Sequence, residues 1–157
     1  MKTIAQTLTA LSLSAMLPTA HAAAPIELCK ILRSFADSIP PNSEQEFTYR
    51  ISWGENFKDS QEAVLGAKRC EHNGYEPARN ICSYLMKHAS IKSAGVVVMQ
   101  AVSCLSRKSR FDPSLKIHSA DLSFSYGGRN RGALIDVTYE EDIKVGGMAL
   151  RLVATGY

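Results

Sequence analysis

The C-terminal part of the chain alternates apolar and polar residues with the period of β-strands. Residues 116–126, 134–139 and 148–155 all show this alternation, and the glycine pairs Gly127-Gly128 and Gly146-Gly147 come before the second and third runs. Because successive side chains of a strand point to opposite faces of a sheet, each run predicts a half-buried strand. Glycine readily supplies the positive φ angles that tight turns need. The sequence therefore predicts an antiparallel meander at the C-terminus.

The run at residues 96–105 is apolar on both faces, so its period fits both a strand and a helix. The three consecutive valines Val96, Val97 and Val98 favour a strand, because β-branched side chains are stiff and pack well on a pleated surface. Apolar residues also recur at helical spacing here, so a helix is the alternative. We interpret the run as a central strand, the first of four in the meander.

Earlier in the chain the period of the apolar residues changes several times. Steps of three and four residues over 25–39, ended by two prolines, predict a helix. Residues 47–53 alternate and predict a strand. A second helix is predicted over residues 60–71, because Asp59 and Glu62 resemble a capping pair at its start. A third helix is predicted to begin at Pro77, since proline is favoured in a first turn.

These elements predict a single α+β domain over residues 23–157, with three helices packed on an antiparallel sheet of about five strands. A chain of this length is expected to form one hydrophobic core. The order of elements resembles cystatin-like folds, in which helix packs on a curved antiparallel sheet. The resemblance is one of architecture and implies no activity.

Residues 1–22 have the features of a secretory signal peptide. Lys2 is followed by a mostly apolar run over residues 5–18 and by the small-residue cleavage signal Ala20-His21-Ala22. We therefore expect the mature protein to reside in the periplasm of a bacterium or outside the cell. No later apolar run approaches the roughly 20 residues of a membrane helix, so no membrane span is predicted. The formal net charge of +3 is too small to favour a nucleic-acid partner.

Four cysteines lie in the expected mature chain, namely Cys29, Cys70, Cys82 and Cys104. An even number of cysteines in an oxidising compartment predicts two disulfides, for which three connectivities exist. If residues 60–71 and the helix after Pro77 form an antiparallel pair, Cys70 and Cys82 lie at equivalent heights and face each other. We therefore favour the pairing Cys70–Cys82, which leaves Cys29–Cys104 as the second bond.

No motif for catalysis, metal binding or a cofactor is present in the sequence. We therefore expect neither a cofactor nor a bound metal. His72 falls in a polar loop, whereas His88 and His118 fall on apolar faces, where a partly buried structural histidine is the usual outcome. If these two met Asp121 in one cleft, they could act as a general acid and base.

Charged residues next to the predicted meander are the candidates for binding a partner. In a four-stranded meander the first and third connections lie at the same end of the sheet. This arrangement would bring together Arg107, Lys108, Arg110, Glu140, Glu141 and Asp142. Such residues can form solvated ion pairs of little individual value, which we favour, or a surface that steers a partner. The other end carries Arg129 and Arg131, which could bind an anionic group.

We interpret the chain as a non-enzymatic interaction protein, such as an inhibitor, an immunity protein or an assembly factor. Its partner would be another periplasmic or secreted protein. One alternative is a small-ligand carrier with a cavity between helices and sheet. The side chains expected to line that cavity are Phe47, Tyr49, Trp53, Phe124 and Tyr126. A second alternative is a cell-envelope hydrolase that uses His88, His118 and Asp121.

Overall fold

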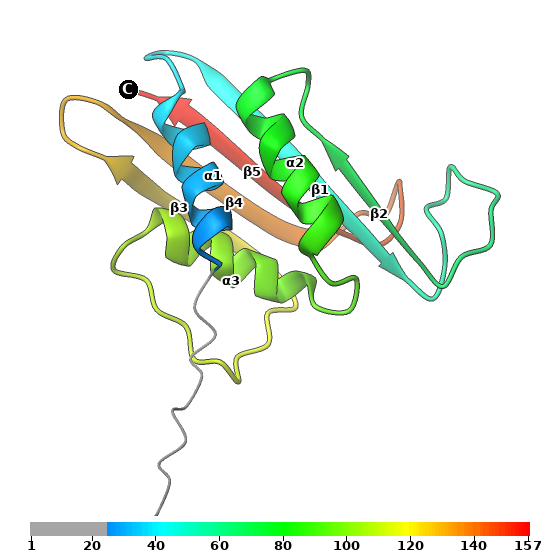
Figure 1. Cartoon of the computed structure of the whole chain (residues 1–157). Helices are drawn as coiled ribbons and strands as arrows, with labels where there is room; N and C mark the ends of the chain where they lie inside the picture. The colour runs from blue at the N-terminus through cyan, green and yellow to red at the C-terminus, as the bar shows by residue number, and fades with distance from the viewer. Residues whose placement is uncertain (1–24) are drawn as a thin grey trace, which may run out of the picture.

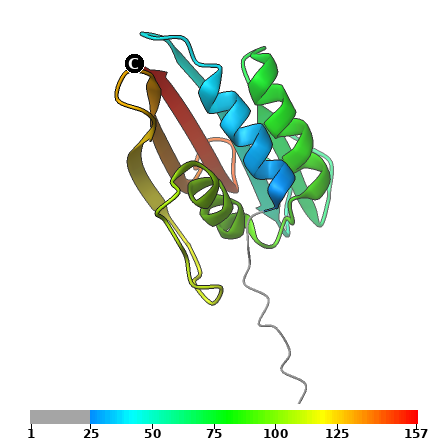
Figure 2. The same cartoon turned by 60° about the vertical axis from the view of Figure 1, so that its left-hand side comes forward.

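The computed structural model describes residues 25–157, so the predicted signal peptide lies outside the described residues. Three helices lie on one face of a five-stranded antiparallel sheet (Figures 1 and 2). The elements in chain order are α1 (Ile26–Asp37), β1 (Glu44–Trp53), β2 (Gly66–Glu71), α2 (Glu76–His88), α3 (Ala94–Leu105), β3 (Ala120–Gly127), β4 (Gly132–Glu141) and β5 (Met148–Gly156). The predicted fold class is confirmed.

The strand order across the sheet is β2-β1-β5-β4-β3, and every neighbouring pair is antiparallel. The last three strands form the predicted C-terminal meander, and β1 pairs with its final strand. The inward-facing residues of the central strands are fully buried, as Leu152, Ile135 and Val137 illustrate. Their alternation with outward-facing polar residues is therefore what assigns one face of the sheet to the core.

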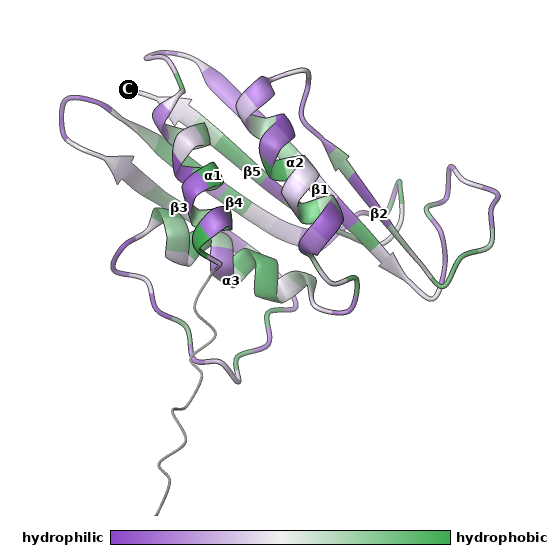
Figure 3. Cartoon of the chain, viewed as in Figure 1, coloured by the Kyte–Doolittle hydropathy of each residue, from purple (hydrophilic) through white to green (hydrophobic). Residues whose placement is uncertain are grey.

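The core lies between this face of the sheet and the three helices. The stripe of α1 contributes Leu28, Leu32 and Phe35, all 1% exposed or less. Phe35 packs edge-on against Phe47 of β1, with ring centroids 6.0 Å apart. Hydrophobic and hydrophilic residues alternate along α1 and α2, as expected for helices with one buried side (Figure 3).

Both predicted disulfides are present, Cys29–Cys104 and Cys70–Cys82. The first joins α1 to α3, and the second joins β2 to α2. The geometric reason for the second pairing was wrong, however, because Cys70 lies on a strand and not on a helix. Each bond therefore fixes a helix of the cover to another part of the fold.

The helix predicted over residues 60–71 is not formed. Residues 66–71 form β2, which pairs with β1 at the edge of the sheet, and the preceding residues form a loop. Asp59, predicted to cap a helix, instead binds the guanidinium group of Arg69 through both carboxylate oxygens, at 2.6 and 2.7 Å. The apolar stripe of this segment was too weak for a helix to be preferred over pairing with β1.

The strand predicted over residues 96–105 is also wrong, because these residues form α3. Val97, Val98, Ala101 and Val102 are all buried between α1 and the sheet. Burial on most sides gives this helix the same unbroken apolar pattern as a central strand. Packing therefore outweighs the β-propensity of its valines. The number of helices agrees with the prediction because one predicted helix is lost and another is gained.

Candidate functional site

A hollow of about 910 Å³ lies at the Trp53 end of the sheet. We call it the Trp53 groove. Its walls are the ends of β1 and β4, the first turns of α3 and the segment over residues 113–118. Its main side chains are Trp53, Ile91, Lys92, Val96, Met99, Leu115, Lys116, Ile117, His118, Tyr139, Glu141 and Met148.

Trp53 reaches this groove because it is the last residue of β1, beyond the part of the strand that the helices cover. Its side chain is 57% exposed. The ammonium group of Lys92 lies 4.5 Å from the centroid of its ring, in a cation–π contact. Ile91 packs closely on the main chain of β2 at Gly66. A Cβ added to Gly66 would lie 3.1 Å from a methyl carbon of Ile91.

The other wall depends on a close contact between two main chains. A Cβ added to Gly95, in the first turn of α3, would lie 2.6 Å from the carbonyl oxygen of Ile117. Only glycine lets the segment over residues 113–118 approach α3 this closely. That approach places Leu115, which is 44% exposed, opposite the first turns of α3.

The groove combines apolar side chains with a comparable amount of polar surface. Lys92 and Lys116 carry positive charge, Glu55 and Glu141 carry negative charge, and His118 is exposed. Burial raises the pKa of Tyr139 above its ordinary value of 10.0. The groove therefore offers both apolar surface and polar groups to a bound molecule.

The structure separates the charged residues that were predicted to lie together. Arg107 and Lys108 lie beside Gly127, at the end of β3, whereas Glu140 and Glu141 lie at the opposite end of β4. The nine residue steps of β4 make this separation about 30 Å. The expected cluster required residues 96–105 to be the first strand of the meander. As α3, they deliver the chain to the other end of the sheet.

The remaining members of that predicted set have separate positions. Arg110 is exposed in the loop after α3. Asp142 accepts hydrogen bonds from the N–H groups of Lys144 and Val145 and from the Nε of Arg50. The hydrogen bond from Val145, followed by that from Arg50, lowers the pKa of Asp142. Asp142 thus stabilises the turn before β5.

The structure brings basic residues together at the other end of the sheet. Arg107 and Lys108 line a hollow together with Asp37 and Tyr126, and Arg131 lines an adjoining hollow that shares these two residues. Burial, and then the Asp37 carboxylate, raises the pKa of Tyr126. We call Arg107, Lys108 and Arg131 the basic end of the molecule.

The predicted acid–base set does not converge. Asp121 belongs to the outward-facing residues of β3, where it is opposite Thr138. His118 borders the Trp53 groove, and His88 stacks on Tyr84 of α2 with ring centroids 4.6 Å apart. His72 lies in the turn before α2. These side chains do not form the cleft that the hydrolase hypothesis required.

The predicted carrier cavity is filled. Phe47 and Tyr49 are each 1% exposed and belong to the core, while Phe124 and Tyr126 pack against its margin. Of the five expected lining residues, only Trp53 borders the groove. The open space therefore lies at the end of the sheet and not between the sheet and the helices.

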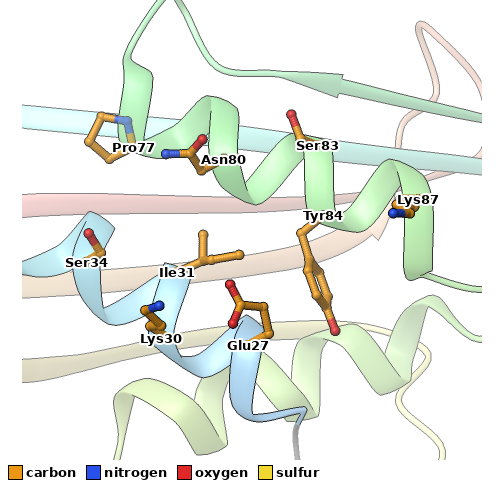
Figure 4. A pocket seen from close by; sticks show the side chains of 9 residues that line it. All are labelled: Glu27, Lys30, Ile31, Ser34, Pro77, Asn80, Ser83, Tyr84 and Lys87. Carbon is orange, nitrogen blue, oxygen red and sulfur yellow. The ribbon is translucent and has the colours of Figure 1, made fainter.

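A smaller hollow of about 440 Å³ lies between α1 and α2 (Figure 4). Figure 4 shows Ile31 and Tyr84 between the two helices, with Glu27 and Lys87 nearby. This hollow has half the volume of the Trp53 groove and lacks an exposed large apolar side chain of comparable size. We regard the Trp53 groove as the better candidate site.

Comparison with known proteins leaves the site without a counterpart. No protein-family model, curated protein or solved structure matches this chain. Within residues 25–157, no group of three or more His, Cys, Asp or Glu side chains is placed to hold a metal ion. No helix in the described part of the chain is long and apolar enough to cross a membrane. The function must therefore be argued from the geometry of the groove.

Proposed function

We propose that the protein is an exported, non-enzymatic binding protein that holds an apolar segment of another exported protein in the Trp53 groove. Two disulfides support a compartment that is oxidising, in the periplasm or outside the cell. An inhibitor, an immunity protein or an assembly factor would use such a site in the same way.

The observation that carries this proposal is the exposure of Trp53 at the rim of the groove. Tryptophan is enriched among the residues that dominate protein interfaces, because it buries a large area with little loss of side-chain entropy. Trp53 is 57% exposed, and Val96 and Leu115 expose apolar surface beside it. Lys92 contacts one face of the Trp53 ring, so the side chain loses less conformational entropy when a partner binds.

Capture of partners from a periplasmic or culture extract tests the proposal. We expect the wild-type protein to retain a stoichiometric protein partner that Trp53→Ala loses. Leu134→Ala is the matched control, because Leu134 is similarly exposed, at 41%, but lies on the helix-free face of the sheet. Equal capture by all three proteins, or capture of no partner by any of them, would contradict the proposal.

The volume of the groove, about 910 Å³, also favours a second function, the carriage of a small apolar molecule. Pockets for such molecules usually measure about 300–1,000 Å³. Native mass spectrometry separates the two functions. A co-purified small molecule that Trp53→Ala fails to retain would support carriage, whereas a protein partner lost in the same variant would support the first proposal.

A further inference from the structure

β3 is an open edge of the sheet. Within residues 25–157, β4 is the only strand that pairs with it (Figures 1 and 2). Its eight residues alternate without interruption between half-buried and exposed side chains, and they contain no proline. A regular edge strand is a template for pairing with a further strand. Asp121 is the only charged residue in the strand.

The opposite edge strand, β2, is protected by several features. It has six residues, two of which are Lys68 and Arg69. The ammonium group of Lys68 donates hydrogen bonds to the carbonyl oxygens of Met86 and Ala89 at the end of α2. The disulfide of Cys70 ties this strand to the same helix. Charged side chains and covering elements are the usual means of blocking an edge, and β3 has only the single charge of Asp121 and no disulfide.

The hydrogen-bond pattern identifies which main-chain groups of β3 are free. The N–H of Gly128 donates a hydrogen bond to the carbonyl oxygen of Arg131. Gly132 lies opposite Gly127, but its main-chain groups bond to Tyr157, on the side of β5, so Gly127 and Gly132 form a non-bonded pair. In an antiparallel ladder, bonded and non-bonded pairs alternate. The N–H and C=O groups of Asp121, Ser123 and Ser125 must therefore point away from β4, toward the open edge.

The side chains of β3 favour an extended segment with alternating character. Leu122, Phe124 and Tyr126 point toward the core side but are only half-buried, because the helices cover them from one side. A sixth strand would cover them with its own apolar residues. The opposite face of such a strand would lie beside the polar side chains of Asp121, Ser123 and Ser125.

The charge at one end of β3 favours an acidic partner. Arg107 and Lys108 lie beside Ser125 and Gly127, and Arg131 lies beside Gly127. None of the three takes part in an ion pair with any of the described residues. Asp37 is the one acidic side chain that lines these hollows. Acidic residues of a partner would therefore meet uncompensated positive charge here.

We propose that the β3 edge is a second binding site, which takes an extended acidic segment of a partner protein as a sixth, antiparallel strand. The N-terminal end of the added strand lies beside Gly127, so its acidic residues come first and contact the basic end. Its following residues alternate apolar and polar. The basic end of this site lies at the opposite end of the sheet from the Trp53 groove, which adjoins only the start of β3, where Tyr139 pairs with Ala120.

A synthetic peptide, acetyl-Glu-Glu-Val-Thr-Val-Thr-Val-amide, tests the proposal against the mature protein. We expect it to slow hydrogen exchange at the amides of Asp121, Ser123 and Ser125, which point to the open edge. Methylation of the alternate peptide nitrogens that face β3 should abolish the effect. Methylation of the intervening nitrogens is the matched control and should preserve it. No added protection at the three amides with millimolar peptide would overturn the proposal.

The charge of the basic end is tested separately. The double variant Arg107→Glu, Lys108→Glu should weaken peptide binding by roughly tenfold or more, because attraction is replaced by repulsion. The control Lys87→Glu, Lys144→Glu makes the same change of net charge away from β3, because Lys87 lies on α2 and Lys144 in the turn between β4 and β5, and it should bind normally. An equal loss of peptide affinity in both double variants would contradict the proposal that the partner segment is acidic. If the protein dimerises and these three amides are protected from hydrogen exchange without peptide, the edge pairs with a second copy of the chain. That result would also overturn the proposal of an acidic partner.

Discussion

The ammonium group of Lys92 lies 4.5 Å from the centroid of the Trp53 ring, which joins the end of β1 to the turn before α3. The two residues are 39 positions apart in the sequence. Trp53 is also the only tryptophan in the chain. Its fluorescence therefore reports on the groove alone, without a contribution from the core.

Replacing Lys92 with alanine should expose the Trp53 ring without disturbing the fold. A cation–π contact at an exposed site is worth about 0.5–1 kcal/mol, so the free energy of unfolding should fall by no more than this. Acrylamide should quench the fluorescence of Trp53 more strongly than in the wild type. Lys92→Arg keeps the cation over the ring and should resemble the wild type. Unchanged quenching in Lys92→Ala would show that the contact does not persist in solution.

Replacing Gly95 with alanine should damage the groove wall. In an open helix this change stabilises by about 1 kcal/mol, because glycine is a poor helix former. Here the new Cβ would lie 2.6 Å from the carbonyl oxygen of Ile117, and overpacking of this kind costs about 1–3 kcal/mol. We expect a net loss of stability in chemical denaturation and weaker binding in the groove. Gln100→Ala, a change to alanine in α3 outside the groove, is the control, and a more stable Gly95→Ala variant would contradict the contact.

Replacing Tyr49 with phenylalanine should not destabilise the protein at neutral pH. The hydroxyl group of Tyr49 is buried and has no hydrogen-bond partner in the described structure. Removing a polar group that is left unpaired is neutral or favourable, by up to about 1 kcal/mol. Thermal unfolding at pH 7 measures this directly. A loss of more than about 2 kcal/mol would indicate a partner that the structure does not contain.

The same substitution should change the stability of the protein in alkali. Burial raises the pKa of Tyr49 from 10.0 to about 12, so between these values the unfolded chain loses a proton that the folded protein keeps. The ionisation of Tyr49 therefore leaves the free energy of unfolding unchanged below pH 10 and lowers it as the pH rises from 10 to about 12. The loss is on the order of 2–3 kcal/mol. Denaturation across this range should show a smaller fall for Tyr49→Phe, whereas the exposed control Tyr157→Phe should follow the wild type.

The two disulfides should contribute unequally to stability. Cys29 and Cys104 are separated by 75 residues, whereas Cys70 and Cys82 are separated by 12. The chain-entropy model gives about 4.5 kcal/mol for the longer loop and about 3 kcal/mol for the shorter one. The double serine variant of the first pair should therefore unfold at a lower denaturant concentration than that of the second. The reverse order would indicate that attachment of β2 to α2 outweighs the length of the closed loop.

Replacing Asp142 with asparagine should weaken the turn before β5 and alter the response to acid. The carboxylate binds two main-chain N–H groups and Arg50, which itself lies 2.7 Å from Glu71. Loss of the charge should cost about 1–3 kcal/mol at neutral pH. The pKa of Asp142 is lowered on folding, so its contribution is present above the ordinary value of 3.8 and disappears as the pH falls through the lowered value. Acid titration should show a smaller loss of stability for the variant below pH 4.

Elements with a clear period were predictable from the sequence. The stripe of α1 and the alternation in β1, β3, β4 and β5 each assign one side to the core, and the structure places those sides inward. The disulfide pairing was also predictable, although Cys70 proved to lie on a strand. The two errors concern residues 60–71 and 96–105, where the apolar pattern was too weak or too continuous to define a period. Tertiary contacts decided both segments.

The candidate site was mostly beyond reach of the sequence. Trp53 was predicted to line a cavity between the helices and the sheet, and nothing local links it to Lys92 or Leu115, which come from later connections. The close approach of Gly95 to Ile117 depends on α3 being a helix, which was not the favoured interpretation. The separation of Arg107 from Glu141 follows from the same element. One misassigned segment thus placed Arg107 and Lys108 at the wrong end of the sheet.

The bond between Cys29 and Cys104 has a further consequence when a protease cuts the chain. The chain between these residues is a covalent ring, and it contains both Trp53 and Lys92. A single cleavage in the exposed loop between β1 and β2 would leave the two fragments attached to each other. Such a nicked molecule would run as one species without reductant and as two with it, so the groove could survive a cut that would otherwise separate its walls.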